Sequence, residues 1–130
     1  MIVDASAVLA ILQREPERVA FVDALDSAKS RKMSVVNHFE VAIKVDRSPD
    51  PIITRKFAEL IEDSDIEVVP ISLEQAVIAR EAYRDFGKGS GHKAQLNLGD
   101  CFAYALATVT KKPLLYKGND FVHTDIRSAV

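Results

Sequence analysis

Acidic and amide side chains stand at positions in this sequence where a folded sheet could bring them together. Asp4 directly follows a short apolar run, and Asn119 and Asp120 form a turn just after another apolar run. Glu40 lies in a stretch with helical periodicity, and Asp100 lies in the expected first turn of a later helix. Four separated segments therefore carry groups that are able to hold a cation.

Such a cluster favours metal chemistry, because several carboxylates in one place repel one another unless protons or a cation intervene. Mg²⁺ prefers oxygen ligands and keeps several of its waters. In such a site it activates water, shields phosphate charge and stabilises a leaving oxygen. Glu40 stands four residues after Val36 and three before Ile43. That is the margin of an apolar stripe, where a solvated acid has little reason to be.

Each of these residues also has a local explanation. Asp4 or Ser6 could cap the following helix, and Asp100 could complement a helix dipole; for either segment taken alone this is the better explanation. Asn119 and Asp120 after a glycine are ordinary turn residues, and Glu40 could reach solvent. Together, however, the local explanations require four coincidences at one edge of one sheet.

Strands alternate with helices along the whole chain, and each expected strand is short and continuously apolar. That order is typical of a parallel sheet covered on both faces, in which ligands bind beyond the carboxyl ends of the strands. We therefore predict an α/β fold, with a mostly parallel central sheet in one domain spanning residues 1–130. The expected strands are 1–3, 33–36, 66–70 and 113–116, and the expected helices are 5–14, 16–28, 37–45, 52–62, 73–86 and 98–110, with a loop at 47–51.

The composition is that of an ordinary compact domain. The 130 residues are 48% hydrophobic and 28% charged, with a net charge of −2. A chain of this size and composition can form a hydrophobic core without disulfide or metal cross-links. No apolar run approaches the roughly 20 residues of a membrane span. A single cysteine and the lack of a signal-like start lead us to expect a cytoplasmic protein. Binding nucleic acid mainly by charge would usually require a strongly basic chain, so bound cations would have to hold the phosphates.

Several segments together resemble the VapC-type ribonucleases of the PIN-domain family. The opening Met1–Val8 resembles their first strand, which ends in Asp followed two residues later by Ser or Thr. Ser34 to Glu40 resembles their second segment. The most specific stretches are Leu96–Ala105 and Pro113–Phe121, and the resemblance spans the whole chain in the right order.

The resemblance implies a PIN-domain-like three-layer α/β/α sandwich and a metal-dependent endoribonuclease that hydrolyses RNA to 5′-phosphate and 3′-hydroxyl ends. Asp4, Glu40 and Asp100 take the positions of the metal-binding and catalytic acids, and Ser6 that of the supporting hydroxyl. The metal would be Mg²⁺, for which Mn²⁺ could substitute.

At the fourth acidic position, Asn119 stands where many members have Asp, and Asp120 is its neighbour. Either Asn119 contributes a neutral oxygen or Asp120 supplies the charge. The resemblance also implies a homodimer and a cognate VapB-type antitoxin, together forming the type II toxin–antitoxin hetero-oligomer. It does not identify the RNA that is cut.

Other reactive residues have structural interpretations. Cys101 has no apparent histidine partner, so packing is favoured over a nucleophilic role. His38 and His123 are more often structural or exposed than catalytic. Lys88, His92 and Lys93 could contact phosphates, although charged flexible loops are usually only solvated.

Two other functions compete with the nuclease. A phosphoryl-transfer enzyme or signalling receiver would need a second acid close to Asp4, where Ala5 and Ser6 stand instead. A non-catalytic PIN-like module that binds RNA or protein would have lost its acids, and here Asn119 is the only sign of such loss.

Overall fold

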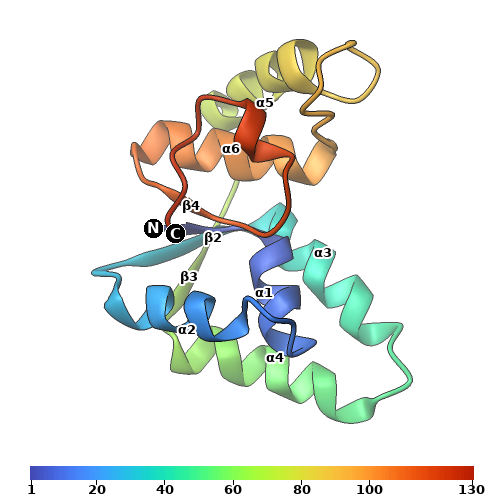
Figure 1. Cartoon of the computed structure of the whole chain (residues 1–130), viewed down its shortest axis with the longest axis vertical. Helices are drawn as coiled ribbons and strands as arrows, with labels where there is room; N and C mark the ends of the chain where they lie inside the picture. Colours follow the sequence, from blue (N-terminus) through green and yellow to red (C-terminus); the bar gives the residue numbers. More distant parts are fainter.

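The computed structural model describes residues 1–130, which form one parallel sheet with helices on both faces (Figure 1). Four strands lie in the order β3-β2-β1-β4, and every neighbouring pair is parallel. The strands are β1 (Ile2–Val3), β2 (Arg31–Ser34), β3 (Ile66–Val69) and β4 (Leu114–Leu115). The helices are α1 (Ala5–Leu12), α2 (Arg18–Ser27), α3 (Val35–Asp46), α4 (Pro51–Asp63), α5 (Leu73–Phe86), α6 (Leu98–Thr110) and the short 3₁₀ helix η1 (Phe121–His123).

Alternation along the short strands separates two apolar cores. Val3 and Leu115 pack with helices α1 to α4 on one face, whereas Ile2 and Leu114 pack with α5 and α6 on the other. Successive strand residues point to opposite faces of a sheet, so two residues per strand are enough to anchor both layers. The predicted three-layer α/β/α architecture with a parallel sheet is confirmed.

Several predicted boundaries were wrong by a few residues. The second strand was expected at 33–36, but β2 ends at Ser34, whose side chain accepts a hydrogen bond from the backbone N–H of Val36 at 3.3 Å and caps α3. The apolar run that we assigned to a strand therefore spans a strand end and a helix start. The expected loop at 47–51 ends one residue earlier, because Asp50 caps α4 and Pro51 occupies its first turn, where a missing N–H costs nothing.

The topology places several chain segments at one edge of the sheet. Helices α1 and α3 begin immediately after β1 and β2, and the turn at 118–120 follows β4. Because the strands are parallel, their carboxyl ends meet at the same edge. None of the helices has both the length and the apolar character needed to cross a membrane.

Candidate active site

A polar cavity of about 300 Å³ opens at the carboxyl edge of the sheet. Its lining includes all but one of the candidates chosen from sequence: Asp4, Ser6, Glu40, Asp100 and Asp120. Asn119 is the exception, because it lies in the exposed turn next to the cavity and is not part of its lining. The structure therefore brings together acids from α1, α3, α6 and the segment after β4.

Asp4 is both a helix cap and a buried wall of this cavity. It is only 3% exposed, and its Oδ2 accepts hydrogen bonds from the Ser6 N–H at 3.0 Å and the Ser6 hydroxyl at 2.5 Å. The Ser6 Oγ in turn accepts the backbone N–H of Lys117 at 2.9 Å. Burial raises the pKa of Asp4 to about 6 despite the bonds from Ser6, and the charge of Glu40 acts in the same direction. Ser6 thus joins the start of α1 to the segment after β4.

Glu40 is held by a buried amide. The Asn37 Nδ2, within a fully buried residue, donates to Glu40 Oε1 at 2.8 Å and to the carbonyl oxygen of Gly99 at 3.0 Å. The carboxylate lies so close to Gly99 that a Cβ there would stand 2.1 Å from Glu40 Oε1. Burial raises the pKa of Glu40, and the negative charge of Asp100 adds to this increase. Asn37 and Gly99 therefore set the position of the Glu40 carboxylate between α3 and α6.

Asp100 belongs to a reciprocal cap at the start of α6. Asn97 Oδ1 accepts the Asp100 N–H at 2.8 Å, and Asp100 Oδ2 accepts the Asn97 N–H at 3.0 Å. Burial raises the pKa of Asp100 to about 6, and the charges of Asp4 and Asp120 contribute. The same carboxylate therefore stabilises the start of α6, while the negative charges of its acidic neighbours disfavour its ionised form.

The donor set suits Mg²⁺ rather than a closed, all-protein metal cage. The cavity lining contains five carboxylates, including Glu15, and two ammonium groups, those of Lys44 and Lys117. Lys117 is already ion-paired with Glu15 and Glu17. No three acidic, histidine or cysteine side chains converge closely enough to enclose an ion by themselves. Mg²⁺ uses one or two carboxylates and retains several waters, so an open site with oxygen donors fits it.

Sequence reasoning did not identify Asn37 or Gly99 as parts of the site. Asn37 stands three residues before Glu40, a spacing that puts two helical side chains together, and a polar residue amid an apolar stretch was a usable signal. Nothing local pointed to Gly99, because its role depends on contact with another helix. Lys117, whose backbone N–H donates to the Ser6 hydroxyl, was also not among the candidates chosen from sequence.

The remaining reactive residues are placed as structural ones. Cys101 is buried, and this raises the pKa of its thiol to about 11, so it stays protonated and poorly nucleophilic. The His38 ring packs on Phe57 with centroids 4.9 Å apart. His92 packs edge-on against Phe86, and its Nδ1 accepts the Ala94 N–H.

Comparison with known proteins gives the family. A family model described as PIN domain matches residues 1–127. Ribonuclease VapC28 of Mycobacterium tuberculosis is 49% identical over 100% of this chain and 98% of its own length. Ribonuclease VapC42 of the same organism is 46% identical, over 99% of this chain and 98% of its own length.

Solved structures show the same fold at low sequence identity. M. tuberculosis VapC20, described as a sarcin–ricin loop cleaving toxin, aligns with a TM-score of 0.73 at 11% identity, over 96% of this chain and 95% of its own. A toxin–antitoxin complex from Klebsiella pneumoniae aligns with a TM-score of 0.69 at 14% identity, over 92% and 88%. The chain therefore belongs to the PIN-domain family, and the two relatives above, matched over nearly their full length, are named as VapC ribonucleases.

Proposed function

We propose that this protein is a metal-dependent endoribonuclease and the toxin of a type II toxin–antitoxin pair. The observation that carries the proposal is the gathering of buried Asp4 and half-buried Glu40 and Asp100 around one cavity, with the pKa of each raised mainly by loss of solvent. Full-length relatives named VapC ribonucleases support the activity. Keeping several carboxylates close together and away from solvent is energetically unfavourable unless a cation binds them, so this arrangement supports a cation-dependent site.

Asp4 and Asp100 would hold Mg²⁺, and Glu40 would complete the site directly or through water. When bound, the metal supplies positive charge to the phosphate and lowers the pKa of a water molecule. Ser6 keeps the Asp4 carboxylate in one orientation, and Asn37 does the same for Glu40. One of these carboxylates accepts the proton of the attacking water.

The remaining parts of the lining have supporting roles. Lys44 is the cavity cation without a carboxylate within ion-pair distance, and it would attract the RNA backbone. Asp120, which lines the cavity, takes the fourth acidic position in this proposal, and the exposed Asn119 has no direct role. Attack on phosphorus with departure of the 3′ oxygen leaves 5′-phosphate and 3′-hydroxyl ends. Mn²⁺, with similar oxygen preference, would substitute for Mg²⁺.

Protein partners are part of the proposal. The structural neighbour from Klebsiella pneumoniae is a toxin–antitoxin complex, which supports a VapB-type antitoxin for this chain. Val35, Phe39 and Ile43 form an exposed apolar stripe along α3 at four-residue spacing. Exposed apolar stripes are typical of protein contacts, and we assign this one to the homodimer. The toxin would act on RNA in the cytoplasm.

The test is cleavage of RNA by the purified, antitoxin-free protein. We would incubate it with total RNA and Mg²⁺ or Mn²⁺, beside an EDTA sample and an Asp4→Ala variant, and map the new ends. Discrete cuts that vanish with EDTA and in the variant are the expected result. Cleavage that persists in the variant would point to a contaminating nuclease. No cleavage by the folded, metal-loaded protein would instead favour a binding module without catalysis.

A further inference from the structure

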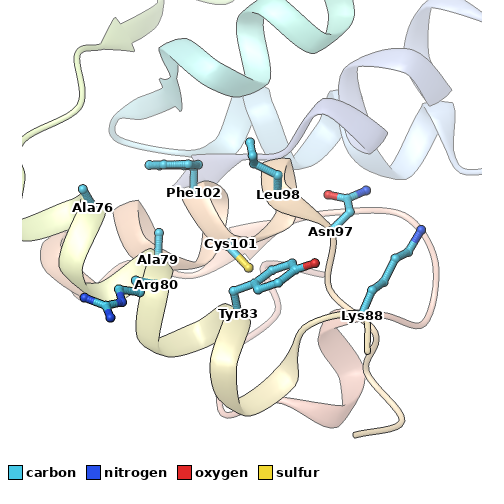
Figure 2. Close-up of a pocket in the computed structure, with 9 residues that line it drawn as sticks. All are labelled: Ala76, Ala79, Arg80, Tyr83, Lys88, Asn97, Leu98, Cys101 and Phe102. Carbon is cyan, nitrogen blue, oxygen red and sulfur yellow. The ribbon is translucent and has the colours of Figure 1, made fainter. Parts of the chain in front are cut away.

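A second cavity has a volume of about 430 Å³, and Figure 2 shows the residues that line it. It lies between α5 and α6, and Ala76, Ala79 and Cys101 belong to its apolar lining. Asn97, the residue before α6, lines both cavities, and it exchanges two hydrogen bonds with Asp100 of the acidic cavity. The second cavity therefore lies beside the carboxylates.

The edge of this second cavity carries polar groups that the protein itself does not use. Figure 2 shows Tyr83, Asn97 and Lys88 around the same open space, with Arg80 further along α5. Asn97 uses its Oδ1 to cap α6, and its Nδ2 makes no hydrogen bond within the chain. The Tyr83 hydroxyl, the Lys88 ammonium and the Arg80 guanidinium likewise have no hydrogen-bond or ion-pair partner.

One feature places this cavity beside the carboxylates, and a second makes it accessible to a ligand. The charge of Lys88 is close enough to Asp100 to lower its pKa against the effect of burial. Tyr83 is 47% exposed, so one part of its ring packs in the protein and the rest is available to a ligand. The cavity thus combines apolar walls, an accessible aromatic ring and a free amide donor with two cations, of which Lys88 is the one near Asp100.

We propose that this cavity binds an unpaired nucleobase of the RNA substrate, adjacent to the phosphodiester that lies among the carboxylates. A base has apolar faces, which suit the walls and the Tyr83 ring, and a polar edge that can accept from Asn97 Nδ2. Proteins recognise single-stranded RNA by stacking bases on aromatic rings and bonding to their edges. Lys88 and Arg80 would contact neighbouring phosphates. This inference rests on the proposed ribonuclease function and names the part of the RNA that the site selects.

A second copy of the chain is the competing occupant, and the charges favour RNA. Lysine is depleted in protein–protein interfaces, whereas Lys88 belongs to the lining of this cavity. RNA brings phosphates that neutralise both cations. The purely apolar stripe of Val35, Phe39 and Ile43 offers a better surface for a second copy.

The experiment measures RNA binding separately from cleavage. Binding of a random-sequence, unstructured ribo-oligonucleotide to the full-length Asp4→Asn protein is followed by fluorescence anisotropy, alone and with Tyr83→Leu or Tyr83→Phe added. We expect Tyr83→Leu to weaken binding by about 5- to 100-fold, and Tyr83→Phe to stay within about threefold, because the ring supplies the stacking. Lys88→Gln should reduce the salt dependence of RNA affinity by the amount expected for about one lost phosphate contact. Lys111→Gln, at the far edge of the sheet, should leave that dependence unchanged.

Equal RNA affinity of the Tyr83→Leu and parent proteins would overturn the inference. So would a change of oligomeric state in Tyr83→Leu, measured by sedimentation, since that would assign the cavity to a second copy. Thermal melts establish that each variant is folded, and if Tyr83→Leu is not, the different salt dependence expected for Lys88→Gln and Lys111→Gln still tests the inference. If the wild-type protein never cleaves RNA but binds it in a Tyr83-dependent manner, the proposed nuclease function is wrong and the proposed base-binding site is supported.

Discussion

The two edges of the sheet carry opposite charge. Acidic side chains surround the cavity at the carboxyl edge, whereas the cavity of about 390 Å³ at the other edge is lined by Lys29, Lys111, Lys112 and Arg127 and by no carboxylate side chain. In a parallel sheet the connecting helices run opposite to the strands, so helix starts gather at one edge and helix ends at the other. The helix dipole favours acids at the first and cations at the second.

Helix ends therefore account for the capping acids Asp4 and Asp100 at one edge and for basic side chains at the other, but not for Glu40, which lies within α3. Arg31, for example, donates from Nη1 to the carbonyl oxygens of Leu25 and Ala28, both at 2.7 Å, where α2 ends. Acids that cap helices nevertheless differ in how deeply they are buried. Asp50 caps α4 while exposed, but Asp4 caps α1 while buried beside other acids. Capping does not require burial, so burial of a capping acid is the signal of a functional site.

The largest effect should come from removing charge at the acidic edge. We expect Asp4→Asn to reduce RNA cleavage by about 10³-fold, since it removes a carboxylate that we propose as a metal ligand and proton acceptor. The same change should raise the metal-free free energy of unfolding near pH 7.5 by roughly 1–3 kcal/mol, because a buried carboxylate is replaced by a neutral amide. Cleavage assays and urea titrations measure the two effects.

Lys29→Gln at the opposite edge is the matched control for Asp4→Asn. It changes one charge beside a helix end, and we expect cleavage to remain within about twofold and the unfolding free energy within about 0.5 kcal/mol. A loss of cleavage as large as that of Asp4→Asn would remove the functional distinction between the two edges.

Mg²⁺ should stabilise the protein only where the acids are ionised. Because the pKa values of Asp4 and Asp100 are raised to about 6, the folded state holds more protons than the unfolded state between about pH 4 and 6. The stability of the metal-free protein should therefore fall as pH rises through that window. Mg²⁺ competes with those protons, so the gain in Tm should be absent at about pH 5 and clear at about pH 7.5.

Differential scanning calorimetry with and without Mg²⁺ at the two pH values measures this effect. At a metal concentration of 100 times Kd the gain corresponds to about 2.7 kcal/mol. An equal gain at both pH values would show that the ion binds away from the buried acids, and Asp4→Asn should lose most of the gain.

Gly99→Ala should disturb the position of Glu40 without unfolding the protein. The new Cβ would collide with the end of a flexible side chain rather than with backbone, so the Glu40 carboxylate must leave Asn37. We expect cleavage to fall by about 10- to 100-fold, with less than about 1.5 kcal/mol lost in stability. In a protein that already carries Glu40→Gln, Gly99→Ala should reduce cleavage much less. An equal reduction of cleavage with and without Glu40→Gln would show that Gly99 does not act through Glu40.

The smallest effect should come from the helix end at the basic edge. Lys111 ends α6 with φ of 55°, a left-handed conformation in which glycine carries no steric penalty. We expect Lys111→Gly to stabilise the protein by about 0.5–1 kcal/mol in urea unfolding, with cleavage unchanged. A loss of cleavage in this variant would instead show that the basic edge contributes to RNA cleavage.

Local patterns were sufficient for most of the fold and for most of the acids. The short apolar runs and intervening helical periods predicted the parallel sheet, since each depends only on neighbouring residues. Asp4, Asp100 and Asp120 were found because strand ends and helix starts are visible in sequence. The error at residues 35–36 arose because an apolar run does not show whether it continues a strand or begins a helix.

The sequence by itself determined the order of the elements, the edge at which the acids gather and the resemblance to a family. Only the tertiary structure decided that Asp120 rather than Asn119 lines the cavity, that Asn37 and Gly99 hold Glu40, and that Asn97 lines both cavities. The reason is physical: caps and periodicity are set within a few residues of chain. The contact between α3 and α6, which joins residues 62 positions apart, depends on how whole helices pack across the sheet.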